Sequence, residues 1–125
     1  MQATSWLDCY SEYASSITDA PLEFHQFVGY GVLGAFLGNR IWLPYGDLLL
    51  CPNLWTLLIA PSSRFRKSTA LGIGARILSR AREGIIYSEQ GTSEAWIEEM
   101  EREPAGCFVS YEFTTVAGLL TRDYM

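Results

Sequence analysis

Hydrophobic residues follow a helical period at the start of the chain and give way to short apolar runs further on. Apolar residues from Trp6 to Ile17 recur at steps of three and four, which predicts a helix capped by Thr4. The next segment, residues 21–37, is apolar nearly all round and rich in glycine. This composition predicts a buried helix that packs closely against a neighbour.

The apolar runs after residue 40 are too short for helices and predict strands. Residues 41–50 predict two short strands around a turn at Pro44–Asp47. The run "LWTLLIA", residues 54–60, lacks polar alternation, which is typical of a strand covered on both faces in a parallel sheet. Two more strands are expected within residues 84–90 and 105–113, and helices are expected at 68–81, 92–103 and 114–120.

This alternation of strands and helices predicts an α/β fold. We expect a parallel sheet flanked by helices, incomplete because it has about three core strands. A helical segment, residues 1–45, is expected to pack on a core formed by residues 46–125, so that the chain is a single domain. Its 125 residues and 49% hydrophobic composition are enough to bury such a core.

Charge is distributed unevenly along the chain. The net charge of -5 argues against a free-standing nucleic-acid binder, yet residues 64–82 carry six basic residues and no acid. Residues 83–112 reverse the sign, with eight glutamates. Two interpretations stay open: a solvated basic helix beside an acidic one, or a basic segment that faces an anion.

Other composition features concern localisation. Cys9, Cys51 and Cys107 are widely spaced, so they predict neither a zinc site nor a disulfide framework and fit a reduced, cytoplasmic setting. No signal peptide is apparent after Met1. The apolar stretch from residue 27 to residue 38 is too short to span a bilayer, so we expect no membrane partner. The four tryptophans are expected to be core aromatics.

The segment "IAPSSRFRKST", residues 59–69, has the spacing of a phosphate-binding loop, GxxxxGK followed by Ser or Thr. Lys67 and Ser68 match, whereas neither glycine is present: Pro61 stands at the position of the first and Arg66 at that of the second. The expected strand before it and helix after it provide the required context. In such a loop the lysine reaches the terminal phosphates of a nucleotide and the serine hydroxyl binds magnesium. The candidate ATP-binding residues are Pro61, Ser62, Ser63, Arg64, Arg66, Lys67, Ser68 and Thr69.

The replaced glycines leave an alternative open, because they serve a tight turn and a close approach of the backbone to phosphate. The arginines of the loop, Arg64 and Arg66, can compensate by binding phosphate oxygens with their guanidinium groups. The alternative is an ordinary basic loop between a strand and a helix. A literal GxGxxG at residues 29–34 is treated as chance, because a helical segment precedes it.

A carboxylate follows the last expected strand. "CFVSYEF" places Glu112 at the end of a buried run about 45 residues after Lys67, where nucleotide hydrolases keep a residue that orients water and magnesium. Lys67 and Glu112 are therefore the candidate catalytic residues, and Ser68 and Glu112 the candidate magnesium ligands. Tyr111 stands in place of the usual Asp. Alternatively, Glu112 is a solvent-facing strand end or a helix cap.

With these motifs, "NLWTLLIAPSSRFRKSTAL" and "TSEAWIEEMEREPAGCFVSYEFTTVAGLL", the chain resembles the P-loop ATPase domain of primase-helicase-like replication proteins of phages and mobile elements. The resemblance covers roughly residues 20–120 and implies a P-loop NTPase-like fold. It implies ATP binding by Lys67, Ser68 and Thr69, with Glu112 orienting water and magnesium. Ser93 and Glu94 match a Ser-Glu pair of that family.

The resemblance also sets an expectation about completeness. A full ATPase core of this type has about five parallel strands, so we expect the chain to be the N-terminal part of a larger ATPase, weak or inactive in isolation. An open sheet edge predicts a homo-oligomer, and contact with DNA is expected through the full-length protein.

Two functions therefore remain open. The first is a helicase-type P-loop domain that binds ATP, with or without hydrolysing it, in DNA replication of a phage or mobile element. The second is a catalytically inactive assembly or interaction module that keeps the fold and binds a partner or polynucleotide through its basic loop. A small nucleotide kinase is weaker, because no acceptor-binding or lid segment is recognisable after the loop.

Overall fold

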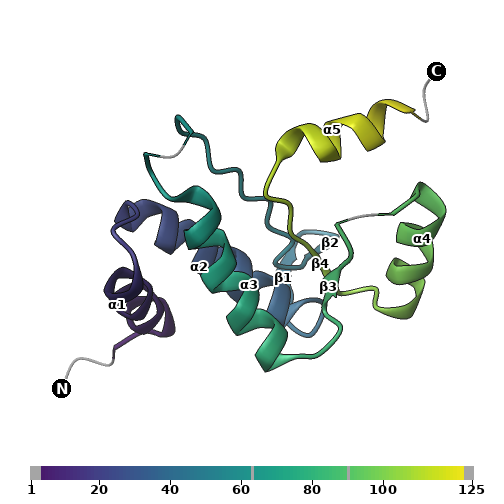
Figure 1. The fold of residues 1–125 in the computed structure, drawn as a ribbon. Coiled ribbons are helices and arrows are strands. Elements are labelled where there is room, and N and C mark those ends of the chain that lie inside the picture. Colours follow the sequence, from purple (N-terminus) through teal and green to yellow (C-terminus); the bar gives the residue numbers. More distant parts are fainter. Residues whose placement is uncertain (1–3, 63, 90, 123–125) are drawn as a thin grey trace.

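The computed structural model describes residues 4–62, 64–89 and 91–122 and has a mixed α/β architecture with five helices and two small sheets (Figure 1). The elements are α1 (Trp6–Ile17), α2 (Leu22–Leu37), β1 (Leu43–Tyr45), β2 (Leu48–Leu50), α3 (Lys67–Ala81), β3 (Ile86–Tyr87), α4 (Ser93–Arg102), β4 (Cys107–Phe108) and α5 (Phe113–Arg122). Their order confirms the predicted alternation in the second half of the chain. In the described part, no helix combines the length and the apolar character needed to cross a bilayer.

Helices α1, α2 and α3 pack together around the hydrophobic core (Figure 1). The core residues are Tyr10, Ala14, Val28, Val32, Ile73, Leu78 and Ile85. Glycines bring the helices close: a Cβ on Gly29 would lie 2.9 Å from the ring of Tyr10, and one on Gly74 would lie 2.3 Å from Val28. The predicted close packing of the glycine-rich second helix is therefore confirmed. Its predicted burial holds for one face only, because Leu22, Phe27, Tyr30 and Phe36 are exposed.

Local signals explain where the first helices begin. Ser5, rather than the predicted Thr4, caps α1: its hydroxyl accepts a hydrogen bond from the backbone N–H of Asp8, whose carboxylate accepts from Ser5 N–H in return. This reciprocal pair is a capping box. Pro21 precedes α2 and lacks the N–H group that a helix start would leave unpaired.

The two sheets differ in topology. β1 and β2 are the two predicted short strands around a turn, and they pair antiparallel, with Leu43 opposite Leu50. The turn is shorter than predicted, because Pro44 and Tyr45 belong to β1. β3 and β4 are parallel, with Ile86 beside Cys107, and the chain passes from one to the other through α4. This pair is the parallel sheet of the described residues; a larger P-loop sheet is not shown.

The segment 54–60, predicted as a buried strand, forms no strand. Its side chains divide between two faces: Leu58 packs against the core, whereas Trp55 and Ile59 are 90% and 80% exposed. The prediction of burial on both faces is wrong here because one face rests on α2, through Leu54 beside Gly34, and the other has no neighbouring strand among the described residues. Trp6, Trp42 and Trp55 are likewise exposed, which corrects the expectation that they are core aromatics.

Candidate phosphate-binding site

The candidate site is built around the N-terminus of α3. Buried Ala70 and Ile73 anchor the first turns of this helix in the core, and this packing fixes the direction of Lys67, Ser68 and Thr69. Ser68 and Thr69 are exposed, and Lys67 is half-buried. The sequence therefore places the lysine and the two hydroxyl residues where the prediction needs them, on the first turn after the loop.

The remaining predicted loop residues lie just before this turn. Pro61, Ser62, Arg64 and Arg66 are exposed, so they are accessible to a ligand. Ser63 lies outside the described residues. The backbone N–H of Arg64 donates to the carbonyl of Ser62 at 2.9 Å.

The N-terminus of α3 has no side-chain cap. Among the described residues, no hydrogen bond engages the backbone N–H groups of Lys67, Ser68 and Thr69; the first one used is that of Ala70, which donates to Arg66 at 3.0 Å. Ser5 caps α1 and Thr92 caps α4, whereas α2 also begins without a side-chain cap. Free N–H groups and the positive end of the helix dipole favour an anion at this position.

Arg66 has the backbone conformation that the missing glycine would favour. Its φ of 48° and ψ of 39° lie in the left-handed region, and it is the one non-glycine residue with positive φ in the described part of the chain. A non-glycine residue in this region costs about 1 kcal/mol, which a glycine would not incur. The Arg66 side chain forms an exposed ion pair with Asp19.

Lys67 closes the loop. Its ammonium group donates a hydrogen bond to the carbonyl oxygen of Ala60, at the other end of the loop. A terminal phosphate at the N-terminus of α3 would therefore compete with Ala60 for this ammonium group. This competition is favourable to the phosphate, because a hydrogen bond between two charged groups is stronger than one to a neutral carbonyl.

Two carboxylates follow the parallel strands. Glu89 comes two residues after β3, and its Oε1 accepts hydrogen bonds from the Ser110 hydroxyl at 2.7 Å and the Tyr111 N–H at 3.0 Å. Glu112 is exposed and directly precedes α5, where its carbonyl accepts from the N–H of Thr115. Because carboxyl ends of parallel strands meet at one edge, both residues lie beyond the same edge of the β3–β4 pair.

Tyr111 places this edge beside α3. Its hydroxyl lies 3.5 Å from the position that a Cβ on Gly72 would occupy. Gly72 is five residues after Lys67, which corresponds to about 7.5 Å along the helix axis. Glu89 is bonded to the backbone of Tyr111, so its connection to α3 is indirect, through that residue.

Sequence reasoning missed Glu89. The signal for it was the same as the one used for Glu112, an acidic residue at the end of an apolar strand run, but Glu89 follows a shorter run. The structure shows Glu89 to be the more fixed of the two, since the neighbouring strand end holds its carboxylate. Within the described residues, no group of three or more His, Cys, Asp or Glu side chains is arranged to hold a metal.

The predicted Ser-Glu pair begins α4 beside this edge. The N–H of Glu94 itself and the Thr92 hydroxyl form hydrogen bonds that lower the pKa of the Glu94 carboxyl below its ordinary range. Both interactions lie within the start of α4, so the Ser93–Glu94 pair is explained by its position at the beginning of a helix.

Comparison with protein-family models, with curated proteins and with solved structures finds no match for this chain.

Proposed function

We propose that this chain is an ATP-binding, helicase-type P-loop domain that serves DNA replication of a phage or mobile element. The observation that carries the proposal is the uncapped N-terminus of α3, where Lys67, Ser68 and Thr69 follow a left-handed residue. A helix start of this kind leaves backbone donors available for phosphate oxygens. The replication role rests on the resemblance of the sequence motifs alone.

The proposed roles follow from chemistry and position. Lys67 would bind the terminal phosphates of ATP, and Ser68 would bind magnesium, which bridges phosphate oxygens. Magnesium prefers oxygen ligands and keeps several waters, so a serine hydroxyl, the phosphates and one carboxylate are a suitable set. Glu112 is the carboxylate predicted from the sequence, and Glu89 is a second candidate because its position is fixed by the strand end.

The binding test is titration calorimetry with ATP and AMP, with and without magnesium. We expect magnesium-dependent binding of ATP that is lost in Lys67→Ala and weakened in Ser68→Ala. Arg76→Ala is the matched control, because this exposed residue lies on the same helix two turns further on. Unchanged ATP affinity in Lys67→Ala would reject the assignment of the loop.

A second test separates the two carboxylates. If hydrolysis is measurable, Glu89→Gln and Glu112→Gln are compared for ATP turnover and for ATP affinity. The residue that orients water should lose turnover on neutralisation and keep binding, because an amide cannot accept the proton of the attacking water. Loss of turnover in neither variant would remove both from the catalytic role.

A specific observation favours the alternative, a catalytically inactive assembly module. The β1–β2 hairpin and the segment 54–60 expose large apolar side chains, which are typical of an interaction surface. The exposed residues are Trp42, Leu43, Tyr45, Leu48, Leu49, Leu50, Leu54, Trp55, Leu57 and Ile59. This module would assemble as a homo-oligomer, and its basic loop would bind anions regardless of magnesium or phosphate number.

Sedimentation velocity and the same titrations decide between the two functions. Strong magnesium-dependent preference for ATP over AMP rejects the inactive module. Salt-sensitive binding of any polyanion, without preference for ATP, rejects the ATPase. A monomer at high concentration contradicts the expected oligomer under either function.

A further inference from the structure

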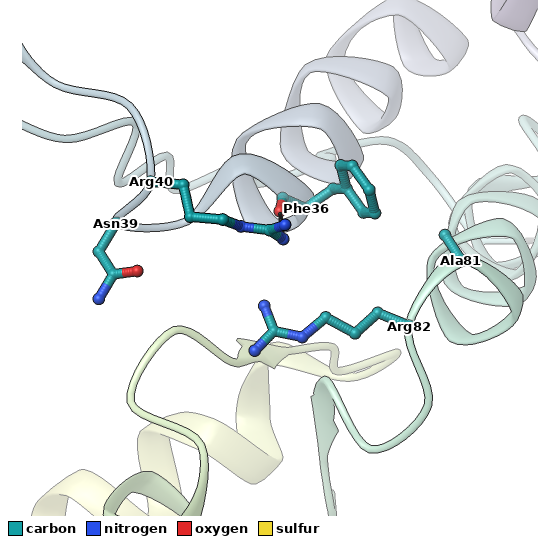
Figure 2. Close-up of a pocket in the computed structure, with 5 residues that line it drawn as sticks. All are labelled: Phe36, Asn39, Arg40, Ala81 and Arg82. Atoms are coloured by element: carbon teal, nitrogen blue, oxygen red, sulfur yellow. Dashed lines mark hydrogen bonds between the residues drawn. The ribbon is translucent and has the colours of Figure 1, made fainter.

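A pocket of about 480 Å³ lies at the opposite end of α3 from Lys67. It is lined by Phe36, Asn39 and Arg40 from the end of α2 and by Ala81 and Arg82 from the end of α3 (Figure 2). The two guanidinium groups point into the same space from opposite walls. A pocket with two convergent arginines differs from a solvated basic surface, because both charges can contact one ligand.

Arg40 is held in place before any ligand arrives. Its Nη2 donates to the carbonyl oxygen of Phe36 at 2.6 Å, and its guanidinium carbon lies 5.2 Å from the centre of the Phe36 ring. These contacts occupy one nitrogen and one face of the group. Among the described residues, Nε and Nη1 of Arg40 have no acceptor, so they are available to a ligand.

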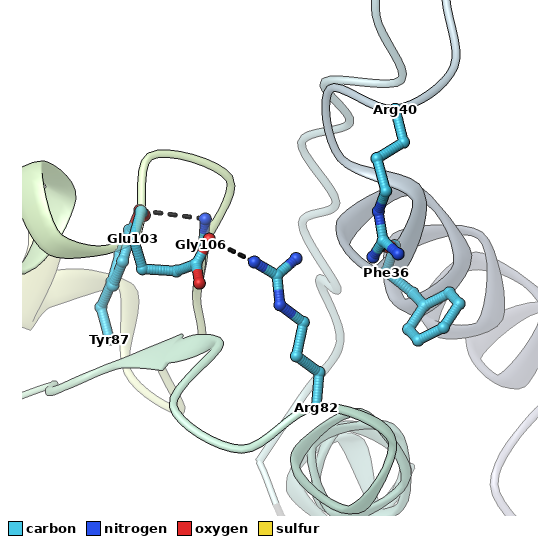
Figure 3. A network of polar contacts seen from close by, with 6 residues as sticks. All are labelled: Phe36, Arg40, Arg82, Tyr87, Glu103 and Gly106. Atoms are coloured by element: carbon cyan, nitrogen blue, oxygen red, sulfur yellow. Dashed lines mark hydrogen bonds and ion pairs between the residues drawn. The ribbon is translucent and has the colours of Figure 1, made fainter.

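Arg82 is held from the other side by Glu103 (Figure 3). Its Nη2 donates to Glu103 Oε1 at 2.6 Å, and the two side chains are 32% and 20% exposed. The backbone of Glu103 is itself fixed, since its carbonyl accepts from the Tyr87 hydroxyl and from Gly106 N–H. Within the part of the chain that the structure describes, Nε and Nη1 of Arg82 have no acceptor.

The charges around the pocket determine which ligand fits. Arg82 is paired with the carboxylate of Glu103, Arg40 has no carboxylate partner among the described residues, and the carbonyl ends of α2 and α3 add partial negative charge. The field of the pocket is therefore weak, and binding depends on direct hydrogen bonds. A phosphate group offers oxygens in several directions and can accept from two guanidinium groups on opposite walls, whereas a carboxylate has two oxygens in one plane.

We propose that this pocket binds a phosphate group through the free Nε and Nη1 atoms of Arg40 and Arg82, with the Asn39 amide as a third donor. The site is separate from the loop at Lys67, because the 15 residues of α3 span about 22 Å. The phosphate comes from a free nucleotide or from the backbone of a single-stranded polynucleotide. Both sources present the same oxygens to the two arginines.

The test uses nuclear magnetic resonance of the arginine Nε–H groups in the full chain. Inorganic phosphate, AMP and a single-stranded thymidine oligonucleotide are titrated separately. The variants are Arg40→Ala, Arg82→Lys and Glu103→Gln, each checked for folding by circular dichroism, because the Arg82–Glu103 pair is partly buried. Lys67→Ala is the control for the other site, and Arg80→Ala is the control for an exposed arginine on the same helix.

We expect the Arg40 and Arg82 signals to shift together with one dissociation constant. Arg40→Ala should weaken binding at least fivefold, and Glu103→Gln should strengthen it severalfold, because the neutral amide no longer competes for Arg82. Lys67→Ala and Arg80→Ala should leave unchanged the affinity that the Arg40 and Arg82 signals report for this pocket. A response to phosphate and AMP identifies a free phosphate ligand, and a response to the oligonucleotide alone identifies the polynucleotide backbone.

The proposal is overturned if none of the three probes shifts these signals in the wild-type chain. It is also overturned if folded Arg40→Ala binds as well as wild type, or if Glu103→Gln weakens binding.

Discussion

Alanine substitution at two glycines of α3 should change stability in opposite directions. A Cβ on Gly74 would lie 2.3 Å from Val28 Cγ1 and 3.0 Å from Val32 Cγ2, closer than carbon atoms approach in a packed core. Relieving this overlap costs about 3 kcal/mol, at the upper end of the range for overpacking. The higher helix propensity of alanine adds about 1 kcal/mol to the stability, so Gly74→Ala should lower the free energy of unfolding by about 2 kcal/mol.

Gly72→Ala is the matched control on the same helix. The added Cβ would lie 3.5 Å from the Tyr111 hydroxyl, which is an ordinary contact. Gly72→Ala should therefore raise the free energy of unfolding by up to about 1 kcal/mol, through the higher helix propensity of alanine. Urea unfolding followed by circular dichroism measures both changes, and the midpoints of thermal unfolding should move by about 4 °C per kcal/mol. The two variants should therefore differ by about 12 °C.

A compensating substitution makes the reasoning refutable at atomic level. Val28→Ala removes the Cγ1 that lies nearest to the added carbon, so Gly74→Ala should cost less in that background by at least 1 kcal/mol. If Gly74→Ala is as stable as Gly72→Ala, or if the double-mutant cycle shows no coupling, the close approach of α2 to α3 described above is wrong.

Three further predictions concern the helix starts and the core. Burial raises the pKa of Tyr10 to about 12, so the unfolded chain releases the phenol proton at a lower pH than the folded chain does. Between pH 10 and 12 the free energy of unfolding of wild type should therefore fall by up to about 3 kcal/mol relative to that of Tyr10→Phe, as measured by urea unfolding. Hydrogen bonds from the Ser5 side chain and backbone lower the pKa of the Asp8 carboxyl in the folded chain. The stabilisation is therefore fully present above the pKa of Asp8 in the unfolded chain and is lost as the pH falls through the pKa of the folded chain. In thermal unfolding at acid pH, the midpoints of wild type and Asp8→Asn should approach each other. Arg66→Gly should raise the free energy of unfolding by about 0.5 kcal/mol, since relief of the left-handed backbone outweighs the exposed pair with Asp19, whereas Arg66→Ala should lower it.

Helices were predictable from the sequence because their signals are local. The helix expected at residues 92–103 agrees with α4 to within one residue at each end, and the glycines of α2 correctly indicated close packing. Strands were less predictable, because a strand exists only where another strand pairs with it. The run 54–60 has the composition of a buried strand, yet among the described residues α2 covers one face and no strand pairs with it.

The candidate site was predictable in part for the same reason. Lys67 and Ser68 belong to a local motif, and the structure places them on the first turn of α3 as that motif requires. Glu89 was missed, because its significance depends on hydrogen bonds to residues more than 20 positions later in the chain. The Arg40–Arg82 pocket also joins distant segments, so no spacing in the sequence could have revealed it.

The start of α3 favours an anion but does not by itself separate the two proposed functions. Arg66 adopts a left-handed conformation that a glycine would adopt without strain, but it carries a side chain where a glycine would let the backbone approach phosphate closely. Both functions place an anion at this helix start, ATP in one and any polyanion in the other, and both gain from backbone N–H groups that no side chain caps. The two functions differ in what the ligand must present. An ATPase requires magnesium and the terminal phosphates, whereas an inactive module binds by charge alone, so a magnesium-dependent preference for ATP over AMP is the property that separates them.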